Sequence, residues 1–68
     1  MRFRAFGPSL AGCHEIPSEV AAGFIARGGE DIQVWDTEYI IDSVSEEAAI
    51  YAARELALTD LEEAPEEN

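Results

Sequence analysis

The chain has 68 residues and carries 15 acidic residues against four arginines and no lysine, which gives a formal net charge of −11 at pH 7. A chain of this size forms one domain at most, and its hydrophobic content of 47% is too high for a generic disordered chain. Its single cysteine excludes an internal disulfide, and no apolar run approaches the ~20 residues needed to cross a bilayer. We therefore expect a folded protein in the cytoplasm, away from membranes.

The charge is unevenly distributed along the chain. Residues 1 to 29 have a net charge of +1, whereas residues 30 to 68 carry thirteen acids against Arg54 alone. In so small a domain, much of one surface must then project negative potential, which attracts cationic partners and repels nucleic acid. The sequence predicts a basic protein surface as the partner, with no direct contact to nucleic acid.

The first 29 residues predict a strand followed by a helix. Met1 to Phe6 alternates apolar and charged residues, the period of a strand with one buried side. After a loop of unpredictable path, Pro17 occupies the first helical position, and Gly28-Gly29 ends the helix. The apolar residues of this helix recur at helical spacing and are Ile16, Val20, Ala21, Phe24 and Ile25.

Residues 31 to 43 predict a hairpin that turns at Asp36-Thr37. This register pairs Val34 with Tyr39 and Ile32 with Ile41, so that four apolar side chains share one face. As a single strand, the same residues would split into two mixed faces. Because Asp-Thr lacks the glycine of the best two-residue turns, a longer loop that shifts the register by one residue is the alternative.

The remaining sequence predicts a second helix and a tail. Ser43-Val44-Ser45-Glu46 matches a capping box with Ser43 as the cap, and acids follow in the first turn. The residues after Leu61 have little to bury and are expected to form a disordered acidic tail over 62–68. The predicted apolar stripe of the helix consists of Ala49, Ile50, Ala53, Leu56 and Ala57.

These elements predict a single α+β domain over residues 1–61, in the order strand, helix, strand, strand, helix. Its sheet is antiparallel and both helices cover one face. The expected core joins the strands to the helices through Phe3, Ile32, Val34, Tyr39, Ile41, Val20, Phe24, Ile25, Ile50, Ala53 and Leu56.

The uncovered face of the hairpin is the candidate binding surface. It presents Trp35 beside Glu38 and Asp31 beside Asp42, with Ile40 between the two acids of its strand. An aromatic and an aliphatic side chain ringed by carboxylates have the anatomy of a protein interface. An equally weighted alternative is that Trp35 packs under the loop and the acids only keep the surface soluble.

Two arginines are expected on the same face. If the first strand joins the sheet, Arg2 and Arg4 can pair with Glu38 or Asp42, each exposed pair contributing at most ~1 kcal/mol. A structural role is the favoured interpretation for both.

No catalytic or metal-binding signature is present. Cys13-His14-Glu15 places three ligand-type side chains in a row, but adjacent residues rarely converge on one ion and no second Cys or His exists. The same adjacency argues against a nucleophile and base pair. The prediction is a protein without enzymatic activity, cofactor or metal.

Tyr51 and Leu58 lie off the stripe of the second helix. We consider two roles for these side chains: they form a homodimer contact, or they cover an edge of the sheet. Edge protection is the default interpretation, because the predicted sheet has two open edges.

The segment from Glu38 to Arg54 resembles the strand, serine cap and alanine-rich helix of many small phage and mobile-element proteins. Among these it is similar to the small acidic anti-CRISPR inhibitors, several of which present carboxylates where DNA phosphates would sit. The resemblance covers about a quarter of the chain. It implies inhibitory binding to the basic groove of a nucleic-acid-binding subunit of a CRISPR-Cas complex, without catalysis.

A physical argument supports mimicry independently. A DNA-binding groove is tuned to one phosphate charge per ~1.7 Å of duplex axis, so a rigid acidic face can occupy it with a strong salt dependence. The alternatives are an adaptor or structural subunit that docks through Trp35 and Ile40, and an antitoxin-like protein that neutralises a basic toxin. The predicted partner-binding residues are Asp31, Trp35, Asp36, Glu38, Ile40, Asp42, Glu46 and Glu47, with a fringe at Glu62, Glu63, Glu66 and Glu67.

Overall fold

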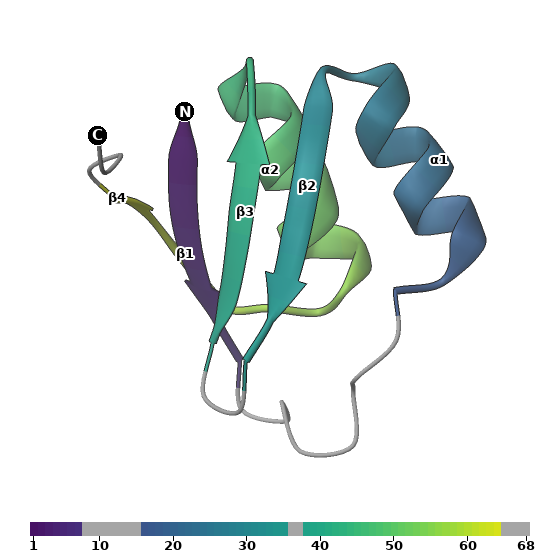
Figure 1. Cartoon of the computed structure of the whole chain (residues 1–68). Coiled ribbons are helices and arrows are strands. Elements are labelled where there is room, and N and C mark those ends of the chain that lie inside the picture. The colour runs from purple at the N-terminus through teal and green to yellow at the C-terminus, as the bar shows by residue number, and fades with distance from the viewer. Residues whose placement is uncertain (8–15, 36–37, 65–68) are drawn as a thin grey trace.

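A computed structural model of the chain describes residues 1–7, 16–35 and 38–64. The elements follow in the order β1 (Arg2–Phe6), α1 (Ser18–Ala26), β2 (Gly29–Val34), β3 (Tyr39–Ser43), α2 (Glu46–Glu55) and β4 (Asp60–Ala64). The strands form one antiparallel sheet in the order β2-β3-β1-β4, and both helices lie on the same side of it (Figure 1). The expected α+β fold is confirmed, with a fourth strand added.

The predicted hairpin and its register are confirmed. Ile32 lies opposite Ile41 and Val34 opposite Tyr39, and the Trp35 N–H donates to the Glu38 carbonyl at 2.9 Å. The predicted turn residues, Asp36 and Thr37, lie outside the described residues. The apolar pattern therefore fixed the pairing correctly without a glycine turn, because a shift of one residue would have exposed every inward side chain.

The core lies between the sheet and the two helices. Tyr39 and Ile41 of the central strand β3 are almost fully buried, and so are Phe3 and Ala5 of β1. From the helices, the core receives Val20, Phe24, Ala48, Ala49, Ala52 and Ala53. Four alanines allow the α2 backbone to lie close to the sheet, where larger side chains would hold it away.

Helix α1 buries a narrower face than its pattern predicts. Val20 and Phe24 are buried, whereas Ile25 is 64% exposed and does not belong to the core. Helix α1 begins at Ser18, so Pro17 is its N-cap and the prediction of Pro17 as the first helical residue is wrong by one position. The expected glycine ending is confirmed: Gly28 adopts a positive φ of 104°, a conformation that L side chains rarely adopt.

Helix α2 begins later than expected. Its N-cap is Ser45, whose hydroxyl accepts the Ala48 N–H at 3.2 Å, so the prediction of Ser43 as the cap is wrong. Ser43 is instead the buried last residue of β3, and its hydroxyl donates to the Ser45 carbonyl at 2.6 Å.

The buried stripe of α2 differs from the predicted one accordingly. Ala49 and Ala53 are buried as expected, but Ile50 is 42% exposed. Ala57 lies beyond the end of the helix and is exposed. Ala48 and Ala52, which the predicted stripe did not include, are buried, whereas Ile50 and Ala57, which it did include, are not.

Residues 60–64 form strand β4, which corrects the expectation of a disordered tail over 62–68 for residues 62–64. In β4, Glu62 lies opposite Arg4 and Glu63 opposite Phe3. Leu61 packs against the core and gives this acidic strand its apolar contact. Residues 65–68 lie outside the described residues.

Neither helix in the described part of the chain is long and apolar enough to cross a membrane.

Candidate binding surfaces

The side of the sheet opposite the helices is not covered by any described element, and we call it the open sheet face. Its residues alternate along each strand with the buried ones, as the strand period requires. On the two central strands they are Arg2, Arg4, Phe6, Ile40 and Asp42. On the edge strands and their ends they are Asp31, Gln33, Trp35, Asp60, Glu62 and Ala64, and Glu38 completes the set just before β3.

Two arginines of β1 neutralise two acids of the hairpin on this face. Arg2 binds Asp42 through two nitrogens, Nε to Oδ1 at 2.8 Å and Nη2 to Oδ2 at 3.1 Å. Arg4 contacts Glu38 Oε1 at 2.6 Å and lies 3.9 Å from Glu62. The expected ion pairs are thus formed. Glu38 and Asp42 belong to cross-strand pairs that reinforce the sheet, so neither offers a free carboxylate.

The pairing with Arg2 also changes the acidity of Asp42. The hydrogen bonds from the guanidinium stabilise the carboxylate and hold the pKa of Asp42 below its usual range, against a smaller opposing effect of burial. Asp42 therefore stays ionised, and paired with the Arg2 guanidinium, to a lower pH than an ordinary aspartate would.

Trp35 is exposed at the end of the hairpin. Its side chain is 56% exposed, and the loop under which it was alternatively expected to pack lies outside the described residues. Ile40 and Phe6 on the same face are half-buried, and the Arg4 guanidinium lies 5.3 Å from the Phe6 ring centre. The open sheet face thus carries an aromatic anchor and some apolar area beside two ion pairs.

Strand β2 and helix α2 begin at the same end of the molecule (Figure 1), and four acidic residues lie at these two starts. We call this group the acidic end: Glu30, Asp31, Glu46 and Glu47. All four are exposed, and none forms an ion pair with a described residue.

Two hydrogen bonds hold the halves of the acidic end together. The Val44 N–H donates to the Gly28 carbonyl at 2.8 Å, and the Ser45 hydroxyl donates to the Arg27 carbonyl at 2.8 Å. These bonds tie the turn before β2 to the turn before α2, so the backbone segments that carry the four carboxylates are joined to each other.

Arg27 lies three residues before Glu30 in the chain. Its guanidinium stacks on the Tyr51 ring at 4.0 Å and donates to the Gly23 carbonyl. Arg27 and Glu47 line the same shallow hollow without forming an ion pair. The cation is thus held along α1, and the acidic end keeps its net negative charge.

The structure therefore divides the predicted binding residues into two groups. Trp35, Glu38, Ile40 and Asp42 share the open sheet face, while Glu46 and Glu47 lie at the acidic end; Asp31 belongs to both. Asp36 lies outside the described residues.

Glu30 was missed by sequence reasoning. It occupies a break in the pairing of β2 with β3, between Gly29 and Asp31. A bulge residue leaves the regular alternation of a strand, and no sequence pattern placed a bulge there.

Within the described ranges, no three side chains of His, Cys, Asp or Glu gather to hold a metal ion. Cys13, His14 and Glu15 lie outside these ranges.

No protein-family model matches the chain, and no curated protein or solved structure matches it either.

Proposed function

We propose that this protein is a non-enzymatic inhibitor that occupies the basic, nucleic-acid-binding surface of another protein, in the manner of an acidic anti-CRISPR protein. Its target class is then a nucleic-acid-binding subunit such as one of a CRISPR-Cas complex, and its place of action is the cytoplasm. Neither a cofactor nor a metal takes part.

The observation that carries this proposal is the acidic end. Four exposed carboxylates, which form no ion pair with a described residue, lie at the starts of β2 and α2, and the turns that precede these two elements are hydrogen-bonded to each other. Because the fold already orders the backbone that carries these acids, binding to a field of Lys and Arg does not have to order that backbone. The acidic end also inherits the release of counterions that favours polyanion binding.

The ion pairs of the open sheet face change which carboxylates we assign to the contact. Glu38 and Asp42 are balanced by Arg4 and Arg2, so their removal would weaken the sheet more than the contact. Glu46 and Glu47, together with Glu30 and Asp31, take the main role in the proposal.

The proposal is tested by competition. A partner is first captured from host lysate at low salt and identified by mass, and its binding to duplex DNA is then measured with increasing amounts of this protein. We expect DNA to be displaced at low salt, with a steep loss of the effect as salt rises. If a saturating amount leaves DNA binding unchanged at low salt, mimicry is wrong.

A second candidate function is favoured by one observation, the 56% exposure of Trp35 beside half-buried Ile40. Large aromatic side chains are frequent anchors of protein interfaces. Under this function the protein is an adaptor or structural subunit and its acidity serves solubility. Trp35→Ala should then abolish partner binding, and binding should be nearly indifferent to salt.

A further inference from the structure

Strand β2 forms one edge of the sheet, and no described strand pairs with its outer side. An open edge presents unpaired backbone N–H and C=O groups to any extended segment that approaches it. Helix α1 lies beside this edge (Figure 1). Within the described domain, a further strand could therefore join the sheet on this side only by pairing with β2, next to α1.

The register identifies the backbone groups that face outward. The Trp35 N–H bonds to Glu38, and in an antiparallel pair hydrogen-bonded residues alternate with non-bonded ones. Trp35, Gln33 and Asp31 thus direct their backbone groups to the partner strand β3. Ile32 and Val34 direct theirs away from β3, toward the open edge.

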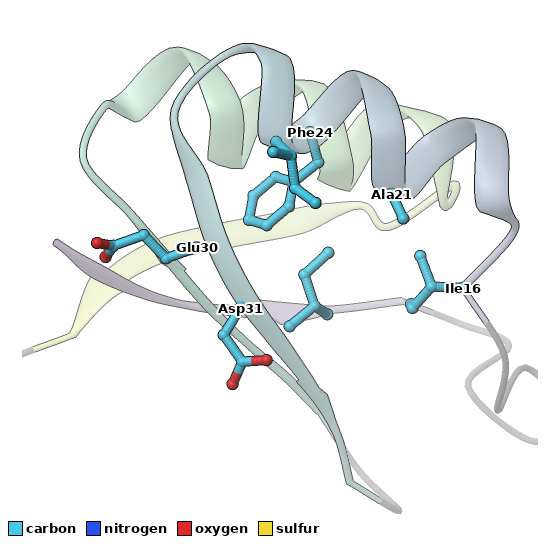
Figure 2. Close-up of a pocket in the computed structure, with 7 residues that line it drawn as sticks. Ile16, Ala21, Phe24, Glu30 and Asp31 are labelled. Atoms are coloured by element: carbon cyan, nitrogen blue, oxygen red, sulfur yellow. The ribbon is translucent and has the colours of Figure 1, made fainter.

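An apolar groove lies along the same edge. It has a volume of about 200 Å³ and is lined by α1 on one side and β2 on the other. Figure 2 shows Ile16, Ala21 and Phe24 around this space, with Glu30 and Asp31 at its border. Ile25 also lines it while remaining 64% exposed, which accounts for an isoleucine at a position that the core does not use.

The border of the groove is acidic. Its lining contains Glu30 and Asp31 but no cation. Asp31 lies opposite Asp42, on the open side of the sheet, whereas the groove lies on the helix side. A strand added at this edge would thus meet apolar side chains on one face and a carboxylate on the other.

We propose that the edge of β2 binds an extended segment of a partner protein in which apolar residues alternate with lysine or arginine. The backbone of the segment would pair with Ile32 and Val34, its apolar side chains would enter the groove beneath α1, and its basic side chains would lie beside Asp31 and Glu30. Addition of a strand to a sheet edge is an established mode of peptide recognition. The inference deepens the proposed function and rests on it in one respect, that the partner is basic.

Charge argues against a second copy of this chain as the occupant. Two β2 edges paired together would bring the acids of both copies to one seam, and each chain already carries a net charge of −11. Like charges on neighbouring strands are destabilising. A basic segment removes this repulsion and replaces it with attraction.

The experiment uses the full chain labelled with 15N and a synthetic ten-residue peptide of alternating valine and lysine. Hydrogen exchange of the backbone amides is followed by NMR with and without the peptide. We expect the Ile32 and Val34 amides to exchange fast in the free protein and to become at least about tenfold slower in the complex, because they then donate to the peptide.

Two modified peptides separate backbone pairing from charge. One carries N-methyl groups on the valines and the other on the lysines, so both keep the composition and charge of the parent. Only one of these two sets of N–H groups can face β2 in a given strand orientation. One peptide should therefore protect Ile32 and Val34 and the other should not.

Variants of the protein test the groove and its border. Ile25→Lys should weaken peptide binding about tenfold, since it removes an apolar contact and adds a like charge. Asp31→Lys should weaken it about fivefold or more, the size of one surface ion pair. Glu63→Lys is the matched control: it makes the same charge change on the exposed opposite edge strand β4 and should alter binding less than Asp31→Lys.

Three results would overturn the inference. The first is peptide binding that leaves the Ile32 and Val34 amides unprotected, or equal protection of these amides by both N-methyl peptides. The contact would then be electrostatic only, and the proposed function would be unaffected. The second is equal weakening by Asp31→Lys and Glu63→Lys. The third is protection of Ile32 and Val34 in the free protein together with a dimer in sedimentation, which would show a second copy at this edge. Failure of the DNA competition alone would overturn the function and leave the strand addition standing.

Discussion

At the scale of single residues, the two arginines of β1 decide which acids of the hairpin are available. Arg2 and Arg4 lie on the strand next to β3, and each reaches an acid across the sheet. Asp31 has no such partner and faces Asp42 from the neighbouring strand. Two aspartates that look alike in sequence thus have opposite roles, one in stabilising the sheet and one in presenting charge.

The pH dependence of stability separates these two aspartates. Because the pKa of Asp42 is lowered in the folded state, its ion pair adds stability above the unfolded pKa, and this stability is lost as the pH falls through the folded pKa. We expect Asp42→Asn to lower the free energy of unfolding at pH 7 by about 1 kcal/mol or less, as for a solvent-screened pair. The difference from the unmodified protein should shrink as the pH falls through the lowered folded pKa of Asp42.

Urea unfolding at a series of pH values measures this difference. Asp31→Asn is the control, and it should be neutral or slightly stabilising at pH 7 because it removes a like charge opposite Asp42. Equal destabilisation by both substitutions would contradict the assigned roles.

At the scale of elements, α2 ends in a turn in which a residue other than glycine, Ala57, adopts a left-handed backbone conformation. Ala57 has a φ of 59°, its N–H donates to the Arg54 carbonyl, and the Leu58 N–H donates to the Ala53 carbonyl at 2.8 Å. These are the two bonds of a Schellman motif, in which glycine is the usual residue at this position. Leu58 packs against the core and supplies the apolar contact that accompanies the motif.

We therefore expect Ala57→Gly to stabilise the protein by about 0.5 to 1 kcal/mol, since glycine adopts this φ without steric cost. Ala22→Gly, at an exposed position inside α1, should instead destabilise by about 1 kcal/mol. Thermal unfolding of both variants provides the measurement. A loss of stability in Ala57→Gly would show that the left-handed turn is not formed.

The fourth strand, β4, contacts the core through Leu61. Leu61→Ala should destabilise the protein by about 1 to 2 kcal/mol, below the range for a fully buried leucine because this one is only half-buried. Glu63→Ala, on the same strand and exposed, should change stability by less than about 0.5 kcal/mol. Equal, small effects in urea unfolding would indicate that β4 is not part of the stable domain.

Sequence reasoning succeeded where a local pattern has only one good solution. The hairpin is such a case, because only one register places Ile32, Val34, Tyr39 and Ile41 on one face. It failed at β4, where acids dominate and the stabilising partner, β1, lies almost sixty residues away in the chain. The end of α2 was missed for a related reason: a left-handed alanine gives no sequence signal, so Ala57 was counted as helical.

The candidate surfaces were predictable to a similar extent. Exposure of Trp35 and the pairing of Arg2 and Arg4 follow from strand alternation, once the three strands are placed together. The acidic end does not follow from alternation, because it depends on a bulge at Glu30 and on hydrogen bonds between two distant turns. The groove beside β2 depends on the packing of α1 and had no sequence signature.

At the scale of the whole molecule, the account depends on the position of charge and not on its total. The formal net charge of −11 would attract any cation, but a screened average charge does not select one groove. Selection requires carboxylates held together at one place. The acidic end provides this arrangement, whereas on the open sheet face Glu38 and Asp42 are held in ion pairs by Arg4 and Arg2.

The most direct measurement compares two variants of equal net charge in the DNA competition experiment. The first neutralises the acidic end by substituting Glu30, Glu46 and Glu47 with Gln and Asp31 with Asn. The second replaces four exposed acids elsewhere with Gln, namely Glu19, Glu55, Glu62 and Glu63. Circular dichroism first establishes that both are folded.

We expect the first variant to lose competition by about tenfold or more and to show a smaller dependence on salt, since up to four carboxylate contacts are removed. The second should compete nearly as well as the unmodified protein. Equal losses in both variants, or a larger loss in the second, would contradict the account.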